Sequence, residues 1–170
     1  MCLYSKTREC QVAEEPITVY KYVAKKHEIL DGEHKGERMS IDALRLYAMT
    51  QWGKPVKAKP VFMSPYYPSA NVTYSVSETV KDNNFQATAM EKYYGALERV
   101  ESIVDHGLHT SKHQKDADIR AKYSVTIDYE TAVLRCTIPA GARYFEGDDD
   151  YCSDTLVVEE VLTEYASPDI

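Results

Sequence analysis

The chain has 170 residues, a length that fits one domain and allows about two-thirds of the unfolded surface to be buried. Hydrophobic residues make up 44% of it and charged residues 28%, proportions that disfavour wholesale disorder. The formal net charge of −7 disfavours a nucleic-acid partner, because phosphates are bound by basic surfaces.

The sequence shows neither a membrane span nor a secretion signal. No apolar run approaches the roughly 20 residues that a membrane-spanning helix needs, and the N-terminus lacks the charged-then-apolar order of a signal peptide. We therefore expect a cytoplasmic protein with no membrane partner, whose cysteines remain thiols. We expect a single domain over residues 1–170, with a flexible tail at about 166–170.

In chain order, the first predicted core strand is 17–23, a run rich in β-branched and aromatic residues behind a proline. Residues 27–38 are polar and contain two glycines, so an exposed loop is predicted there. Ser40 is typical of a helix N-cap, and a glycine at 53 is typical of a helix end. A helix over about 40–52 is therefore predicted, with an apolar stripe formed by Ile41, Leu44, Ala48 and Trp52.

Four prolines between 54 and 68 break any helix, and short strands are predicted at 60–64 and 72–76. A second helix is predicted over about 86–105 and closed by Gly107. Its apolar stripe consists of Met90, Tyr94, Leu97, Val100 and Val104. A short helical turn is expected near 116–123, before the C-terminal strands.

The segment from Ala132 to Glu160 has the clearest pattern in the chain. It predicts a strand, a Pro139-x-Gly141 turn, a second strand, an acidic loop and a third strand. Leu134, Cys136 and Ile138 alternate along the first of these strands and are expected to face the core. The predicted fold class is α+β, a compact single domain with a mainly antiparallel sheet and two principal helices.

Three of the five histidines, His106, His109 and His113, lie within eight residues of one another. Such a group can bind zinc if a fourth ligand, such as Asp105 or a cysteine, joins it. Gly107 breaks the helix that would place the imidazoles on one face, so the alternative is a helix end whose histidines complement the dipole. No metal and no cofactor are predicted, and these histidines are only weak metal candidates.

Four short segments resemble a family when taken together. They are Val19-Tyr-Lys21, Ser64-Pro-Tyr66, Gly107-Leu-His-Thr-Ser111, and Cys136-Thr-Ile-Pro-Ala-Gly-Ala-Arg-Tyr-Phe-Glu-Gly147 with Ser153-Asp154. This layout resembles that of small uncharacterised proteins from gut bacteria of the Bacteroides type and from their phages. The resemblance implies an origin and a fold but no activity. It implies the host cytoplasm if the protein is phage-encoded.

A fainter resemblance is to small ADP-ribosyltransferase-like domains. These also open with a Tyr-bearing strand and end with an Ile-Pro-x-Gly strand followed by a Glu-containing strand. The resemblance implies that Glu159 or Glu160 stabilises a positively charged ribose in the transition state. Lys21 is the only basic residue in the expected first-strand position, and no central Ser-Thr-Ser motif is found. The alternative is that both glutamates are ordinary solvated carboxylates.

Three functions follow from these observations. The first is a protein-binding module, suited by an acidic chain with fourteen tyrosines against three phenylalanines; it could be a phage-encoded accessory, anti-defence or host-takeover protein. The second is an NAD-handling enzyme of the ADP-ribosyltransferase kind, and the third is a binder of a nucleotide or sugar. The candidate catalytic residues are His109, Tyr144 and Glu160, and the candidate ligand-binding residues are Tyr66, His109 and Tyr144. Nothing in the sequence indicates the oligomeric state.

Overall fold

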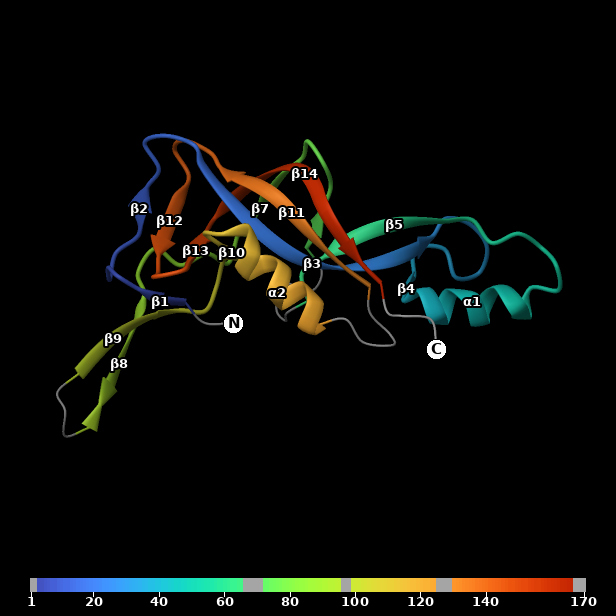
Figure 1. Ribbon diagram of the computed structural model, residues 1–170, viewed down its shortest axis with the longest axis horizontal. Helices are drawn as coiled ribbons and strands as arrows, with labels where there is room; N and C mark the ends of the chain where they lie inside the picture. The colour runs from blue at the N-terminus through green and yellow to red at the C-terminus, as the bar shows by residue number, and fades with distance from the viewer. Residues whose placement is uncertain (1–2, 66–71, 96–98, 125–129, 167–170) are drawn as a thin grey trace.

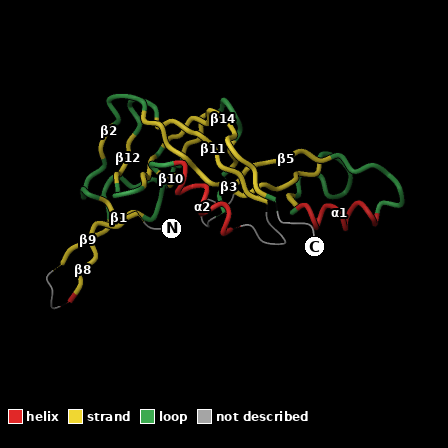
Figure 2. The backbone as a smooth tube through the Cα atoms, viewed as in Figure 1, coloured by secondary structure: helices red, strands yellow, loops and turns green. Residues whose placement is uncertain are grey.

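The computed structural model describes residues 3–65, 72–95, 99–124 and 130–166 (Figure 1). Its strands are β1 (Leu3–Ser5), β2 (Gln11–Val12), β3 (Ile17–Ile29), β4 (Arg38–Met39), β5 (Ala58–Met63), β6 (Thr73–Tyr74), β7 (Thr79–Lys81), β8 (Met90–Tyr94), β9 (Arg99–Val104), β10 (Leu108–Ser111), β11 (Glu130–Ile138), β12 (Arg143–Glu146), β13 (Asp150–Ser153) and β14 (Thr155–Tyr165). Its helices are α1 (Ile41–Thr50) and α2 (Gln114–Ser124). The fold is thus α+β, as predicted, but strands dominate it (Figure 2).

The larger of two sheets has the strand order β2-β12-β13-β10-β3-β11-β14-β7, with β4 and β5 also pairing with β3. Every described pairing in it is antiparallel. The sheet curls around its inner face, where β-branched and aliphatic side chains pack. These inward residues include Val19, Val23, Leu108, Leu134, Cys136, Ile138, Leu156 and Val158. The predicted inward alternation of Leu134, Cys136 and Ile138 is confirmed.

The central strand β3 packs on both of its faces, because successive side chains alternate between the curled interior and the side covered by α2. Val19, Lys21 and Val23 point into the curled interior, whereas Tyr22 points to the opposite face. There α2 covers the sheet, with the fully buried Ala117 and Ala121 against Tyr22 and Val133. The predicted short helical turn at 116–123 is therefore part of this longer helix, whose small alanines allow close approach.

The predicted helix over 86–105 is wrong. The chain there forms β8 and β9, which pair as a hairpin with Met90 opposite Ile103, and β1 adds a third strand beside β9. The spacing of three and four residues between apolar side chains suggested a helix. The same positions also fit two strands whose side chains alternate between the two faces of a sheet. β-branched residues and the break at Gly95, whose φ is +35°, favour strands over a helix.

The other predicted elements need smaller corrections. The polar segment 27–38 is not entirely a loop, because β3 continues to Ile29 and the chain returns as β4, with Gly36 N–H donating to Ile29 O at 2.8 Å. The short strands at 60–64 and 72–76 are confirmed as β5 and β6. The strand-turn-strand order after Ala132 is also confirmed, but the acidic loop is a tight turn that continues directly into β13.

The first predicted helix is confirmed as α1. Ser40 is its N-cap, and the Ser40 Oγ accepts a hydrogen bond from Ala43 N–H at 3.2 Å. The helix ends before Trp52, which has a φ of +52°, and Gly53, which has a φ of +80°. Trp52 therefore does not belong to the packed stripe of the helix, contrary to the prediction. Among the residues that the structure describes, no helix is both long and apolar enough to cross a membrane.

Candidate functional site

The sequence-predicted site residues do not come together. His109 on β10 is paired with Cys152, and Tyr144 on β12 is paired with Ser153. Since paired residues share a face and neighbours alternate, His109 and Tyr144 lie on opposite faces of the sheet. Tyr66 lies outside the described residues.

Glu160 lies apart from both of these residues, on β14. It is paired across the strands with Arg135, and its carboxylate lies 2.9 Å from the Arg135 guanidinium. Both side chains are partly exposed to solvent, so this ion pair is a surface contact of small energetic value. Among the described residues, the Glu160 carboxylate has no contact with the side chain of His109 or of Tyr144.

His109 and Cys152 form a buried polar contact. The His109 Nε2 lies 3.8 Å from the Cys152 Sγ and 3.2 Å from the carbonyl oxygen of Asp105. Because that carbonyl can only accept, Nε2 carries the proton, and the buried Nδ1 has no hydrogen-bond partner among the described residues. Burial, together with the nearby charge of Lys21, lowers the pKa of His109 to about 4.

The contact between His109 and Cys152 is not that of an activated nucleophile. Cys152 is fully buried, and burial raises the pKa of its thiol far above the ordinary value. A catalytic cysteine instead has a lowered pKa and a position open to substrate. The neutral thiol and the neutral imidazole therefore act here as core residues.

The three clustered histidines do not form a metal site. His113 is exposed, and His106 contributes its backbone carbonyl, which accepts a hydrogen bond from the Cys152 thiol at 3.5 Å. In the described part of the chain, no three histidine, cysteine, aspartate or glutamate residues are arranged to hold a metal ion.

Lys21 is the feature that the sequence analysis missed. Its side chain points into the apolar interior and is only 6% exposed, although it ends in an amine. The Nζ donates a hydrogen bond to the His109 carbonyl at 2.8 Å and lies 5.3 Å from the centre of the Tyr74 ring. Burial lowers the pKa of Lys21 to about 8. The signal was present in the inward alternation of Val19, Lys21 and Val23.

Two further polar groups lie in the interior near Lys21. The hydroxyl groups of Tyr74 and Thr110 are buried and have no hydrogen-bond partner among the described residues. Burial also raises the pKa of the Tyr74 phenol and raises that of the Cys136 thiol to about 12. All of these groups are enclosed, so they specify the interior packing and are not presented to a substrate.

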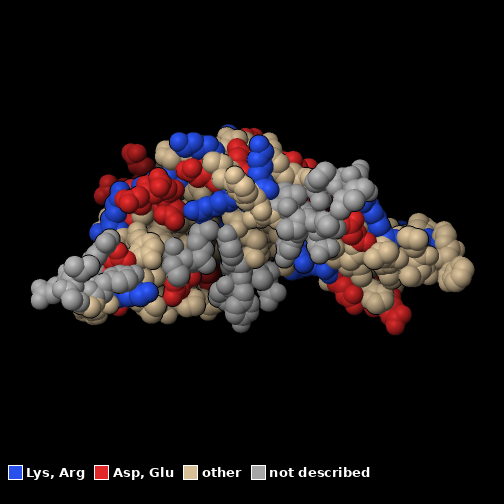
Figure 3. All heavy atoms as spheres, turned by 60° about the horizontal axis from the view of Figure 1, so that its bottom comes forward, with Lys and Arg blue, Asp and Glu red and all other residues tan. Residues whose placement is uncertain are grey.

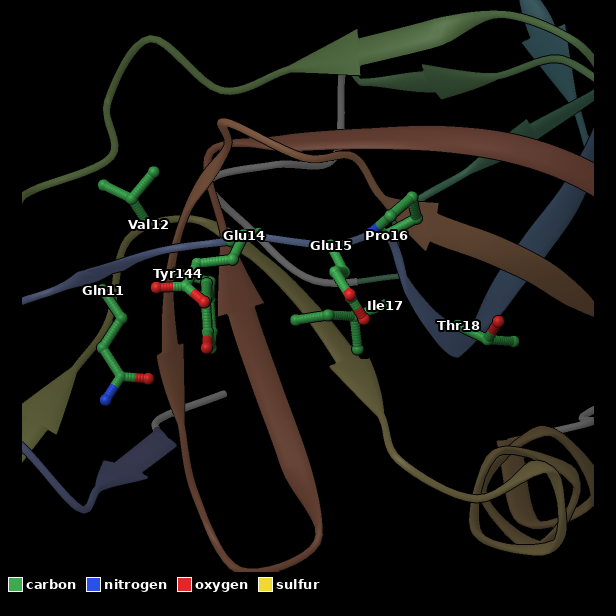
Figure 4. Close-up of a pocket in the computed structure, with 9 residues that line it drawn as sticks. Gln11, Val12, Glu14, Glu15, Pro16, Ile17, Thr18 and Tyr144 are labelled. Carbon is green, nitrogen blue, oxygen red and sulfur yellow. The ribbon is translucent and has the colours of Figure 1, made fainter.

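A hollow opens at the end of the curled sheet where β2 and β12 meet (Figure 4). It has a volume of about 730 Å³ and is lined by residues 11–18 together with Tyr144. The Tyr144 ring packs edge-on against Tyr151, with 5.8 Å between the ring centres. Of the two candidate ligand-binding residues that the structure describes, Tyr144 lines this hollow and His109 does not.

An exposed apolar surface lies at the opposite end of the molecule, on α1. Leu46 is 65% exposed, Met49 78% and Trp52 94%, and none of the residues of the helix is buried. We call these three residues the α1 face. On its other side, α1 contacts the turn between β3 and β4, where the Tyr47 ring lies against the His34 ring with 5.0 Å between centres. In Figure 3, the outermost tip at the right is uncharged, and acidic and basic atoms lie beside it.

The candidate sites are therefore a closed polar interior around Lys21, an open hollow beside Tyr144, and the α1 face. Only the last two are accessible to a partner. Comparison of the chain with protein-family models, with curated proteins and with solved structures finds no match.

Proposed function

We propose that this protein is a protein-binding module whose α1 face inserts into an apolar groove of a different protein. The observation that supports this most is the 94% exposure of Trp52 beside Leu46 and Met49. Contiguous exposed apolar side chains are typical of interaction surfaces. Tryptophan is also enriched among the residues that contribute most to binding.

Contact of the apolar side chains of the α1 face with water raises the free energy of the free protein. Burying an aromatic side chain removes about 200 Å² from water, which stabilises a complex by about 5 kcal/mol before the entropy losses of association. In the free protein, Trp52 contributes almost none of this stabilisation, because its side chain remains in solvent. Insertion into a groove of a partner would bury the Trp52 ring and provide this stabilisation, as happens when other proteins bind amphipathic helices.

The backbone of Trp52 supports the same conclusion. A φ of +52° places a bulky residue in the left-handed region that glycine favours. Such conformations are unfavourable and are found preferentially at functional sites. Here the consequence is that Trp52 projects away from the end of α1 and away from the sheet.

A different protein suits this face better than a second copy. A symmetric dimer needs a self-complementary patch of about 800 Å² on each partner. The three side chains of the α1 face expose on the order of 400 Å², about half of such a patch. A groove in a different protein would enclose them from several sides and so bury more of each.

The proposed setting is a bacterial cytoplasm in which a phage-encoded protein engages a host protein. Its support is the resemblance of the block from Cys136 to Gly147 to proteins of gut bacteria and their phages. The proposal for the α1 face does not depend on this setting, because it rests on the exposure of Leu46, Met49 and Trp52.

The test compares the wild-type protein with the variant Leu46→Ser/Met49→Ser/Trp52→Ser. The matched control is Ile119→Ser/Tyr123→Ser on α2, which removes apolar side chains that are 51% and 86% exposed. Each protein is immobilised and exposed to an extract of the bacterial host, and retained proteins are quantified. A protein retained by the wild type and by the control, but lost at least tenfold with the α1 variant, supports the proposal.

The retained protein is then purified and added to the wild type while Trp52 fluorescence is measured. Because Trp52 is the single tryptophan of the chain, protection from acrylamide reports its burial directly. Absence of protection would contradict the proposal. So would a wild-type dimer in sedimentation that the α1 variant converts to a monomer, since the occupant would then be a second copy.

A further inference from the structure

We propose that the outer edge of β8 binds an extended segment of a partner protein in which an acidic residue lies between apolar ones. The segment would add as an antiparallel strand beside β8, with its acidic side chain opposite Lys92. The hairpin that contains β8 lies at one end of the molecule and α1 lies at the other (Figure 1). The inference therefore does not rest on the proposed function of the α1 face.

β8 has an open edge because it is the last strand of the small sheet. In the order β1-β9-β8, its described pairing is with β9. This pairing runs from Met90 opposite Ile103 to Tyr94 opposite Arg99 without a shift in register. The hairpin of β8 and β9 extends away from the larger sheet (Figure 1). A regular strand with an open edge is a template for an added strand.

The peptide groups that point to this edge are those of Glu91 and Tyr93. Just before β8, Ala89 N–H donates to Arg8 O at 2.8 Å and so points away from β9. Successive residues of an antiparallel strand direct their peptide groups to alternate edges, so Glu91 and Tyr93 follow the direction of Ala89. In the described part of the chain, no backbone group bonds to them on that side.

The outer part of the hairpin lacks the third strand that supports its base. β1 pairs with β9 from Ser102 to Val104, so beyond Ser102 the described sheet consists of β8 and β9. A hairpin of two strands is marginally stable in water, whereas three strands with an apolar face stabilise one another. A strand added beside β8 would provide a third strand for this part of the hairpin.

Two rows of side chains across the small sheet indicate which residues the added strand would carry. Tyr4 pairs with Ile103, which pairs with Met90, so one row is apolar and reaches the open edge at Met90, which is more than half exposed. The next row on the same face pairs Glu101 with Lys92. Apolar neighbours and opposite charges stabilise cross-strand pairs. The added strand would therefore be apolar opposite Met90 and acidic opposite Lys92.

Lys92 disfavours a second copy of the chain as the occupant. A symmetric antiparallel pair of β8 strands that uses both Glu91 and Tyr93 places Lys92 directly opposite its own counterpart. Like charges in that position are destabilising, and a lysine on an edge strand opposes self-pairing. A shifted register would require Ala89, whose N–H is already bonded, or Gly95, whose φ of +35° ends the strand.

The test uses a fluorescent peptide that contains Thr-Val-Glu-Thr-Ile, with binding measured by anisotropy. In the antiparallel register its glutamate lies opposite Lys92 and its isoleucine opposite Met90. The expected dissociation constant is about 100 µM. Lys92→Glu is expected to weaken binding about fivefold, because an attractive pair becomes repulsive. The matched control Lys81→Glu reverses an exposed lysine on the terminal strand β7 and is expected to change binding less than about twofold.

A peptide with lysine in place of its glutamate completes the charge test. The wild type is expected to bind it about fivefold more weakly than the original peptide, and Lys92→Glu is expected to restore its binding. This restoration also shows that the variant keeps its hairpin. If Lys92→Glu binds both peptides as the wild type does, Lys92 does not face the bound strand and the proposal is overturned.

Backbone methylation tests the strand edge and its register. The valine and the second threonine of the peptide lie opposite Tyr93 and Glu91, so their N–H groups point to β8. Methylation of these two nitrogens is expected to weaken binding at least about tenfold. Methylation of the glutamate and isoleucine nitrogens, which point away from β8, is the matched control and is expected to leave binding within about twofold. Equal effects of the two methylated peptides would overturn the proposal.

Two further outcomes would overturn the proposal while leaving the α1 experiment to its own result. The first is absence of binding of the unmodified peptide at about 1 mM protein. The second is a wild-type dimer in sedimentation that dissociates as the peptide is added, since a second copy would then occupy the edge. The variant Leu46→Ser/Met49→Ser/Trp52→Ser is expected to bind the peptide as the wild type does, which keeps the two sites distinguishable.

Discussion

The curled interior and the α1 end place side chains in opposite ways. In the interior, the lysine Lys21 is only 6% exposed, whereas at the α1 end the tryptophan Trp52 is 94% exposed. The interior holds Lys21 because many apolar neighbours fix the strands on either side of it. The α1 end has few such neighbours, so its apolar side chains add little to the stability of the free protein. This contrast places the packing that stabilises the fold in the interior and leaves the apolar side chains of the α1 end in solvent.

The largest expected difference between the two regions comes from one substitution made in each. Leu134 is fully buried in the interior, and Leu134→Ala is expected to lower the free energy of unfolding by about 3 kcal/mol through lost packing and a residual cavity. Leu46→Ala on α1 is expected to change it by less than about 0.5 kcal/mol. Urea unfolding of both variants measures this, and similar effects would contradict the division between the regions.

A second pair of substitutions tests the backbone. A Cβ at Gly107, where φ is +141°, would overlap the Cys152 Sγ, so Gly107→Ala is expected to lower the free energy of unfolding by about 2.5 kcal/mol. Gly53 after α1 has a φ of +80° but nothing within 4 Å of the new Cβ. Gly53→Ala is therefore expected to cost about 1 kcal/mol. Thermal unfolding ranks the two, and the reverse order would be evidence against the close packing at Gly107.

The burial of Lys21 predicts that the free energy of unfolding depends on pH. Its folded-state pKa of about 8 lies below the ordinary 10.5, so between these values the unfolded chain binds a proton that the folded protein does not. The contribution of Lys21 to stability therefore rises with pH across this window. Lys21→Met is expected to be about 2 kcal/mol more stable than the wild type at pH 7, and to lose this advantage by about pH 10.5.

The comparison must be made between the two proteins at each pH. The raised pKa values of Cys136 and Tyr74 lower stability as pH rises, and they do so in both proteins. Chemical denaturation at a series of pH values gives the difference directly. A constant difference from pH 7 to 10.5 would mean that Lys21 keeps its proton in the folded state.

The smallest expected effect on stability is at Trp52. Trp52→Ala is expected to change the free energy of unfolding by less than about 0.5 kcal/mol, because the side chain is almost wholly in solvent. In the wild type, acrylamide is expected to quench its fluorescence nearly as efficiently as that of free tryptophan. Strong protection in the isolated protein would show that the α1 face is already covered.

Local sequence signals predicted part of the fold well. Ser40 and Gly53 marked the ends of α1, and Pro139 and Gly141 marked the turn between β11 and β12, which pair with other strands. Such signals are local because a cap or a tight turn depends on a few neighbouring residues. For the stripe from Met90 to Val104, the one marker was Gly107 beyond its end, and β9 pairs with β1, about 100 residues earlier.

The candidate sites were harder to predict for the same reason. His109, Tyr144 and Glu160 were each chosen as polar residues in recognisable segments, but strand register placed His109 and Tyr144 on opposite faces and Glu160 apart from both, on β14. Exposure of Trp52 could not be read from helical spacing, which fits a packed stripe equally well. Only the inward position of Lys21 was available from alternation along its strand.

The length of β3 has a mechanical consequence. The strand runs from the curled sheet toward the α1 end and forms nine registered pairs with β11, from Ile17 opposite Ile138 to Lys25 opposite Glu130. A partner pulling on α1 along this strand would load those backbone hydrogen bonds together, in shear, and not one after another. Tension applied at α1 would therefore reach the most buried strands without separating their hydrogen bonds one at a time.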